Sequence, residues 1–255
     1  MKSLIIIASF YLLLFPSLVH SVEQKLQHRA TNSAKKNQPS KKPDRSQPFD
    51  FSGTGRPGQQ TAGESRSSCS SQIKPIEAVL PKSNSGSTVS AHPRLWVYFP
   101  GSTAKQIETE FIIQDELRQD FWRSRSRLAA SGYQSFGLPT TAAPLPVGRW
   151  YRWYVKVYCG EESTSAQYVQ GWIRRVSQTT QLQAELQQER QKHHLTYGNH
   201  RIWYDAMDRL LVEYHGNPHS PILKRDWYSL TRAKGVELHR LPDLGSKNNR
   251  QAIAN

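Results

Sequence analysis

The sequence predicts an all-β domain followed by α-helices: an antiparallel β-sandwich of the immunoglobulin or fibronectin type III kind, then a three-helix, tetratricopeptide-like segment. Between residues 76 and 176 apolar and polar residues alternate, and turn residues interrupt the pattern. After residue 176 the apolar spacing changes to that of amphipathic helices. The predicted regions are a signal peptide (1–21), a disordered basic linker (22–60), the β-sandwich (61–176), the helical segment (177–241) and a flexible tail (242–255).

The first 21 residues have the organisation of a secretory signal peptide. Lys2 supplies a positive start, Leu4–Phe15 an apolar run, and Val19-His20-Ser21 a cleavage site. The run is shorter than the roughly 20 apolar residues that span a membrane, although an uncleaved anchor is the alternative. We expect a mature chain that begins near Val22, is exported to the periplasm or beyond, and is not an integral membrane protein.

The predicted linker carries much of the basic charge. The chain has a formal net charge of +14, and residues 22–60 contain eight Lys or Arg and three acidic residues. The segment is rich in Gln, Ser, Lys and Pro and lacks apolar periodicity, which is typical of disorder. A strongly basic exported chain is attracted to polyanions.

Gly53-Thr-Gly55-Arg-Pro-Gly58 fits the G-x-G-x-x-G spacing of dinucleotide-binding loops. That motif works only after a strand and at the start of a helix. No apolar run precedes Gly53, and Pro57 and the Gly/Ser/Gln-rich stretch after it do not favour a helix. We interpret the stretch as an extended entry into the sandwich and expect no cofactor.

Seven strands are predicted, separated by turns at Asn84–Gly86, Pro100-Gly101, Pro139 and Pro144–Pro146. The predicted strands are Ile76–Pro81, Arg94–Phe99, Ile107–Asp115, Asp120–Leu128, Gly132–Leu138, Trp150–Cys159 and Tyr168–Val176.

The strand that begins at Trp150 is the most informative. Its alternation gives a core face of Tyr151, Trp153, Val155, Val157 and Cys159, and an outer face of Trp150, Arg152, Tyr154, Lys156 and Tyr158. Leu145, Gly148 and Tyr151 resemble the tyrosine corner of immunoglobulin-like sandwiches, in which a Tyr hydroxyl bonds to the backbone a few residues upstream. Trp172 and Trp203 are further structural aromatic residues.

Cys69 and Cys159 are the two cysteines of the chain. In an oxidising compartment an even pair indicates a disulfide, and two ligands alone make a poor metal site. The bridge would close a loop of about 90 residues, for which the chain-entropy model gives about 4–5 kcal/mol.

Three helices are predicted. The first runs through residues 179–194, with Leu182 and Leu186 on one face, and the second covers His200–His215. The third begins with Ser220 as N-cap and Pro221 at N1, and ends before Gly235 as its C′ residue. The second and third resemble a tetratricopeptide hairpin, which cannot bury its apolar face alone. We therefore expect it to pack on the first helix and on the sandwich.

Seven motifs, spread in order from about Gly53 to Gly235, resemble the secreted cyanobacterial family called domain of unknown function 928. The resemblance implies an exported bacterial protein and supplies no activity. The motifs are GRPG (Gly55–Gly58), LPKSNSG (Leu80–Gly86), HPRLW (His92–Trp96), EFIIQDE (Glu110–Glu116), YRWYVKVYC (Tyr151–Cys159), GWIRRV (Gly171–Val176) and IWYDA (Ile202–Ala206).

No catalytic or metal-binding set is recognisable. The G-x-S-x-G elbow, the H-E-x-x-H motif and the P-loop do not occur. We interpret His193-His194 as a solvated helix end, and the spacing of His215 and His219 is not fixed by a helix. Asp115 and Glu116 are strand neighbours that face opposite ways, so they are not an acid–base pair. We expect a protein that is not an enzyme and binds no metal.

One surface feature suggests binding. In FWRSRSRL, Trp122, Ser124, Ser126 and Leu128 share one face, and Phe121, Arg123, Arg125 and Arg127 share the other. The arginine row is either an edge that charge protects from aggregation or a polyanion-binding face, joined by Arg152, Lys156 and the rings of Tyr154 and Tyr158.

The sequence thus favours a non-catalytic interaction module of the cell envelope that binds an envelope protein. The alternative is a surface protein that binds an acidic polysaccharide through its basic sheet face. Sequence-specific nucleic-acid binding is not expected.

Overall fold

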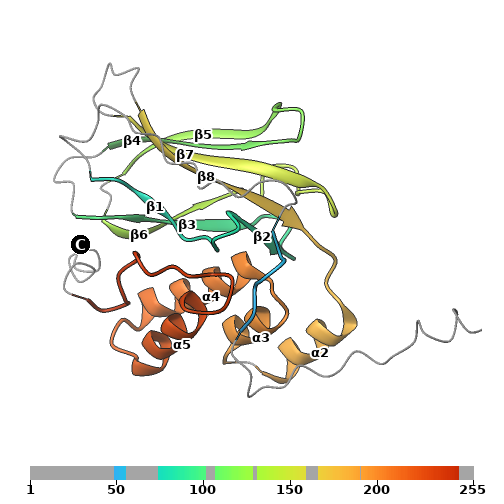
Figure 1. The fold of residues 1–255 in the computed structure, drawn as a ribbon. Coiled ribbons are helices and arrows are strands. Elements are labelled where there is room, and N and C mark those ends of the chain that lie inside the picture. Colours follow the sequence, from blue (N-terminus) through green and yellow to red (C-terminus); the bar gives the residue numbers. More distant parts are fainter. Residues whose placement is uncertain are drawn as a thin grey trace, which may run out of the picture. The chain divides into compact units, whose positions relative to one another are not determined.

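Eight strands in two sheets and four helices make up the described part of the computed structural model (Figure 1). The structure describes residues 49–55, 74–101, 107–128, 131–158, 166–189 and 191–246, all within the unit formed by residues 45–255. The predicted signal peptide, most of the predicted linker, Cys69, Cys159 and the end of the tail lie outside these residues. The predicted disulfide therefore stays a prediction.

The smaller sheet contains three antiparallel strands in the order β1-β3-β6, and the larger sheet contains five in the order β2-β8-β7-β4-β5. The bounds in the smaller sheet are β1 (Glu77–Ala78), β3 (Arg94–Phe99) and β6 (Gly132–Gly137). Those in the larger sheet are β2 (Ser85–Thr88), β4 (Ile107–Gln114), β5 (Asp120–Leu128), β7 (Trp150–Tyr158) and β8 (Ala166–Arg175).

All seven predicted strand regions contain a strand, but the prediction of a wholly antiparallel fold is wrong at one edge. There β2, which the sequence did not predict, pairs parallel with β8. Its sequence, SGST, has no apolar alternation and overlaps a turn signal. Its direction depends on a partner more than 80 residues away in the chain, and no local pattern specifies such a pairing.

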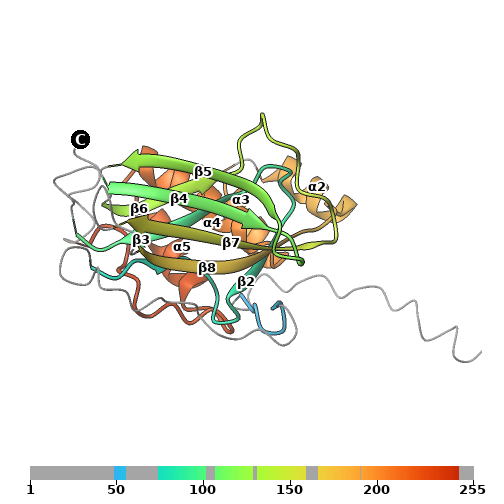
Figure 2. The ribbon, with the colours of Figure 1, turned by 90° about the horizontal axis from the view of Figure 1, so that it is seen from above.

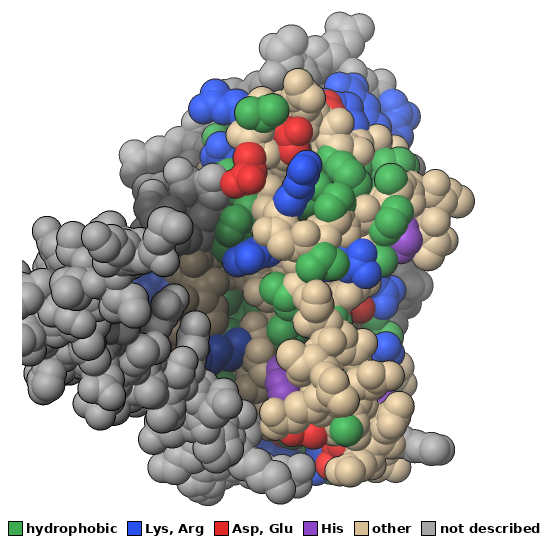
Figure 3. All heavy atoms as spheres, turned by 90° about the vertical axis from the view of Figure 1, so that its right-hand side faces the viewer, with side chains coloured by type: hydrophobic (Ala, Val, Ile, Leu, Met, Phe, Trp, Pro, Cys, Tyr) green, Lys and Arg blue, Asp and Glu red, His purple; other side chains and the backbone are tan. Residues whose placement is uncertain are grey.

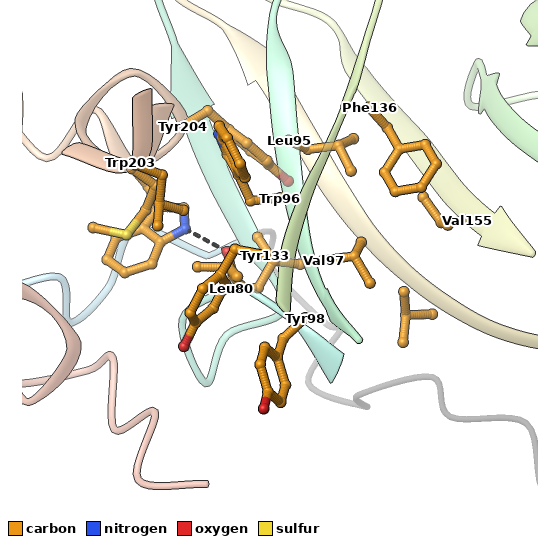
Figure 4. Close-up of a cluster of buried hydrophobic side chains, with 14 of the residues drawn as sticks. Leu80, Leu95, Trp96, Val97, Tyr98, Tyr133, Phe136, Val155, Trp203 and Tyr204 are labelled. Carbon is orange, nitrogen blue, oxygen red and sulfur yellow. Dashed lines mark hydrogen bonds between the residues drawn. The ribbon is translucent and has the colours of Figure 1, made fainter. Parts of the chain in front are cut away.

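The smaller sheet lies between the larger sheet and the helices (Figure 1). As a result, β3 is buried on both faces. On one side Phe136 lies 6.1 Å from Phe111 of the larger sheet, and on the other Tyr133 lies 5.0 Å from Trp227 of the helical layer. Figure 4 shows the same division, with Phe136 directed toward Val155 and Tyr133 on the opposite side of the strands.

The four helices are α2 (Thr180–Gln188), α3 (His193–Asn199), α4 (Trp203–Gly216) and α5 (Pro221–Thr231). Two helices, α2 and α3, replace the first predicted one, and His194 of α3 is buried in the helical layer. Thr179 caps α2, and Ser220 caps α5 as predicted. The predicted role of Gly235 is wrong, because α5 ends earlier, at Thr231, with Arg232 as its C-cap.

Gly235 has a different function in the fold. It adopts a φ of +80°, and a Cβ atom there would lie 2.6 Å from the backbone nitrogen of Ser52. This close approach positions Phe51, whose backbone N–H donates to Lys234 O at 2.8 Å and whose ring packs edge-on against Trp203. Residues 49–55, which the prediction placed in the disordered linker, are therefore part of the packed structure. The predicted tail also starts too early, since Leu244 is buried.

Helix α4 packs directly on the sheets. The Trp203 indole N–H donates to Val79 O at 3.0 Å. The Tyr204 hydroxyl donates to Trp172 O at 3.0 Å and accepts from the Trp153 indole at 2.6 Å. One core therefore runs through sheets and helices, as the helical pattern predicted. In the described part of the chain, no helix combines the length and the apolar character needed to cross a bilayer.

Candidate functional site: the outer face of the larger sheet

The larger sheet has one face in the core and one face that no described helix or strand covers (Figure 2). Strand β7 shows the division, since its burial alternates residue by residue: Tyr151, Trp153, Val155 and Val157 are buried, as predicted. We call the outward side chains of four strands the outer sheet face. They are Glu108, Glu110, Ile112 and Gln114 of β4, Arg123, Arg125 and Arg127 of β5, Trp150, Arg152, Tyr154, Lys156 and Tyr158 of β7, and Tyr168, Gln170, Trp172 and Arg174 of β8.

A carboxylate buried beneath cations lies at the centre of this face. Glu110 is 1% exposed, because longer side chains from both neighbouring strands lie over it. It accepts hydrogen bonds from Arg123 at 2.7 Å, Arg125 at 3.1 Å and the Tyr158 hydroxyl at 2.9 Å, and Lys156 lies 3.6 Å away. Burial alone would raise the pKa of Glu110, but the hydrogen bonds from Arg123, Tyr158 and Arg125 outweigh it and lower the pKa to about 2.

The predicted arginine row lies on β5, the edge strand of the sheet. Arg123 and Arg125 are already paired: Arg123 also binds Asp120 at 2.7 Å, and Arg125 also binds Glu108 at 3.1 Å. Arg127 has no ion pair among the described residues. The row is therefore largely a neutralised ion-pair network and not a free strip of positive charge.

One assignment on this strand was wrong. The prediction placed Phe121 on the arginine face, but its ring packs 5.1 Å from the core residue Tyr151. A β-bulge explains the change, since Ile113 pairs with Trp122 while Gln114 pairs with Asp120. The extra residue shifts the alternation at this point.

Arginines stack on aromatic rings over the rest of the face. The Arg152 guanidinium lies 5.0 Å from the Tyr154 ring and 5.7 Å from the Trp172 ring, and Arg174 lies 5.9 Å from Trp150. Such stacks hold long side chains in defined positions. Trp172, predicted as a structural residue, is thus part of this surface.

Sequence reasoning missed the carboxylates Glu108 and Glu110 and, among the aromatic and basic members of the face, Trp150 as a stacking ring, Tyr168 and Arg174. Tyr168 packs 6.0 Å from Tyr154. The signal was present, because alternation through 168–174 places Tyr168, Trp172 and Arg174 on one side of β8. These residues were not assigned to the face because they lie beside Arg152 and Tyr154 only through the pairing of β8 with β7. That pairing cannot be read from the sequence of β8 alone.

The face carries six Lys or Arg side chains against three carboxylates when Asp120 is included, so it is net positive. It has five aromatic rings. In the described part of the side shown in Figure 3, Lys and Arg are interspersed with apolar and acidic side chains.

The predicted tyrosine corner forms only in part. Leu145 is fully buried and Gly148 adopts a φ of +87°. The predicted hydrogen bond from the Tyr151 hydroxyl to the upstream backbone is not among those of the described residues. Arg175 instead holds this turn, since its guanidinium donates to Leu145 O at 2.9 Å and its carbonyl accepts from Gly148 N at 2.8 Å.

The prediction of a solvated histidine pair was also wrong. His194 is 1% exposed and lies between Asp226 at 3.0 Å and Glu213 at 3.4 Å, so it joins three helices. His215 stacks on Trp96 at 5.3 Å. Across the described ranges, no three potential ligands among His, Cys, Asp and Glu converge as a metal site would require.

A small polar cleft of about 290 Å³ lies between the β2–β3 connection and α4. Asp205 lines it and accepts a hydrogen bond from Val89 N at 3.1 Å. Burial raises the pKa of Asp205 to about 6, against the lowering effect of that bond and one from Thr88. The carboxylate joins α4 to the end of β2, which is a structural role.

The comparison with known families finds one match. The family model described as Domain of Unknown Function (DUF928) matches residues 61–242. The match includes both sheets, all four helices and the whole outer sheet face. No curated protein matches the chain.

Proposed function

The chain belongs to the DUF928 family, and from this membership and the outer sheet face we propose that it is an exported, non-catalytic interaction module of the cell envelope. Its partner is an envelope protein, and its location is the periplasm or the extracellular space. Export rests on the signal-peptide pattern of residues 1–21.

The proposal includes a finer classification of the fold. We assign the sheets to an immunoglobulin-like sandwich, taking β1, β3 and β6 as strands A, B and E, and β5-β4-β7-β8 as C′-C-F-G; the strand order supports this assignment. The position of Tyr151 at the start of the F-like strand is in line with this. The α4–α5 pair, joined by a short turn, is the tetratricopeptide-like hairpin.

The observation that carries the proposed function is the composition and rigidity of the outer sheet face. Tyr, Trp and Arg are the residues that dominate binding energy at protein interfaces. Here Arg152 is held between Tyr154 and Trp172, and Arg125 between Glu110 and Tyr158, which it overlies at 5.2 Å. Side chains fixed in this way lose little conformational entropy on binding.

The test is affinity capture of the full mature chain from its own envelope fraction, with and without the double substitution Arg152→Ala and Tyr154→Ala. We expect loss of the captured protein, with an unchanged melting curve. The matched control is Ile222→Ala with Tyr228→Ala, two exposed apolar residues of α5. If the protein is still captured by the Arg152→Ala, Tyr154→Ala chain but not by the Ile222→Ala, Tyr228→Ala chain, the binding site lies on the helices.

An acidic polysaccharide is the second candidate ligand, favoured by the excess of cations on the face and by Arg127, which has no ion pair among the described residues. Polyanion binding weakens steeply as salt rises. This candidate would be favoured if the chain is retained on an acidic polysaccharide at low salt but not at moderate salt, and captures no protein at either. Capture of one protein that resists salt favours the first candidate.

A further inference from the structure

We propose that the edge of β5 opposite β4, with which no described strand pairs, is a strand-addition site for an acidic, extended segment of a protein partner. This inference rests on the proposed role as a protein-binding module. It specifies the edge of the larger sheet along which the partner's backbone lies and which charge the partner carries.

The first reason is the exposed backbone edge. Strand β5 is nine residues long and, among the described residues, pairs with β4 alone. From Trp122 to Leu128 every residue pairs with β4 in regular register, and the strand contains neither proline nor glycine. A long, regular edge strand is a template for another strand, and extended peptides bind such edges through main-chain hydrogen bonds.

The second reason is charge, for which β4 provides the pattern. Glu108 lies directly opposite Arg127, and Glu110 directly opposite Arg125. An added strand with acidic residues at alternate positions would approach the same arginine row from its other side. The guanidinium groups remain accessible, because the side chains of Arg123 and Arg125 are 44% and 60% exposed.

The same row argues against a second copy of the chain. If two β5 strands paired antiparallel about Arg125, then Arg125 would face Arg125 and Arg123 would face Arg127. Like charges directly opposite each other are destabilising. The edge therefore selects a partner of opposite charge.

The experiment is a fluorescence anisotropy titration of the full mature chain with two labelled nine-residue peptides. One alternates Glu with Val, and the other replaces each Glu with Lys. We expect the acidic peptide to bind and the basic one not to bind. Arg127→Glu should lower the affinity for the acidic peptide by about tenfold or more, since like charges then face each other. The same substitution should allow the basic peptide to bind.

Arg174→Glu is the matched control, because it makes the same change of charge on the outer sheet face but on β8, two strands from β4. It should change the affinity less than twofold. If both substitutions lower the affinity for the acidic peptide equally, binding depends on the total charge of the face, as for a polyanion, and the proposal is overturned. Failure of the acidic peptide to bind would also overturn it.

Hydrogen exchange gives an independent readout. Bound acidic peptide should slow exchange of the backbone amides of residues 122–128, whereas protection confined to β8 or to the helices would contradict strand addition. If the acidic peptide does not bind, but Arg152→Ala with Tyr154→Ala abolishes capture of the envelope protein, this inference is wrong and the proposed function is still supported.

Discussion

Replacing the buried carboxylate Glu110 by Gln should destabilise the fold by about 2 kcal/mol at pH 7. Its pKa falls from 4.5 to about 2, and each pKa unit corresponds to about 1.4 kcal/mol, which gives an upper figure of about 3 kcal/mol. Arg123 and Arg125 are partly exposed, so solvent screens their attraction and lowers the expected value.

The sign of the pH dependence follows from the direction of the shift. A carboxyl group whose pKa is lower in the folded state stabilises the fold at pH values above 4.5, and this contribution is lost as the pH falls from 4.5 toward 2. The stability difference between the wild-type chain and Glu110→Gln should therefore be largest at neutral pH and shrink across that window.

The assay is urea unfolding followed by tryptophan fluorescence at pH 7, 5, 4 and 3. Glu108→Gln is the matched control, because Glu108 pairs with Arg125 alone in the described structure and its side chain is 25% exposed. We expect it to cost less than about 1 kcal/mol. A Glu110→Gln chain as stable as wild type at pH 7, or a difference that stays constant down to pH 3, would refute the reasoning.

Four further outcomes are expected. N-terminal analysis of exported material should find a chain that lacks the first 21 residues, and an intact start would indicate an anchor. Thiol labelling of the denatured, unreduced protein should find neither Cys69 nor Cys159 free, whereas two labelled thiols would exclude the bridge. Gly171→Ala should lower the free energy of unfolding by about 1–3 kcal/mol, because the new methyl group would lie 2.7 Å from the buried Trp153 ring. Gly216→Ala should leave the free energy of unfolding unchanged, because nothing lies within 4 Å of the new methyl group. Equal urea midpoints for the two variants would contradict the packing argument. Asp205→Asn should stabilise the fold by about 1–2 kcal/mol at pH 7, because a carboxyl group whose pKa rises from 3.8 to about 6 on folding destabilises the folded state once the pH exceeds 3.8. The gain should disappear in unfolding curves at pH 3, and its persistence there would assign it to another cause.

The separate elements could be predicted from the sequence because their signals are local. Alternation of apolar residues identified seven of the eight strands and the inward face of β7. The hydroxyl of Ser220 and the ring of Pro221 identified the start of α5, since capping depends on residues within one turn. The arginine row on β5 could be found in the same way.

The errors arose where a residue's environment comes from distant parts of the chain. The parallel pairing of β2, the burial of His194 and the packing of Phe51 on Trp203 each depend on a partner remote in sequence. The bulge at Phe121 is a mismatch between two strands, so neither strand alone reveals it.

The candidate site divides in the same way. The sequence by itself determined that arginines and aromatic rings alternate outward on two strands. Only the tertiary structure decided that β4 lies between β5 and β7. There Glu110 meets Arg123, Arg125 and Lys156, and together with Glu108 and Asp120 it neutralises most of the row. The physical reason is that side-chain direction follows from the period of a single strand, whereas the charge that each side chain experiences depends on which strands become neighbours.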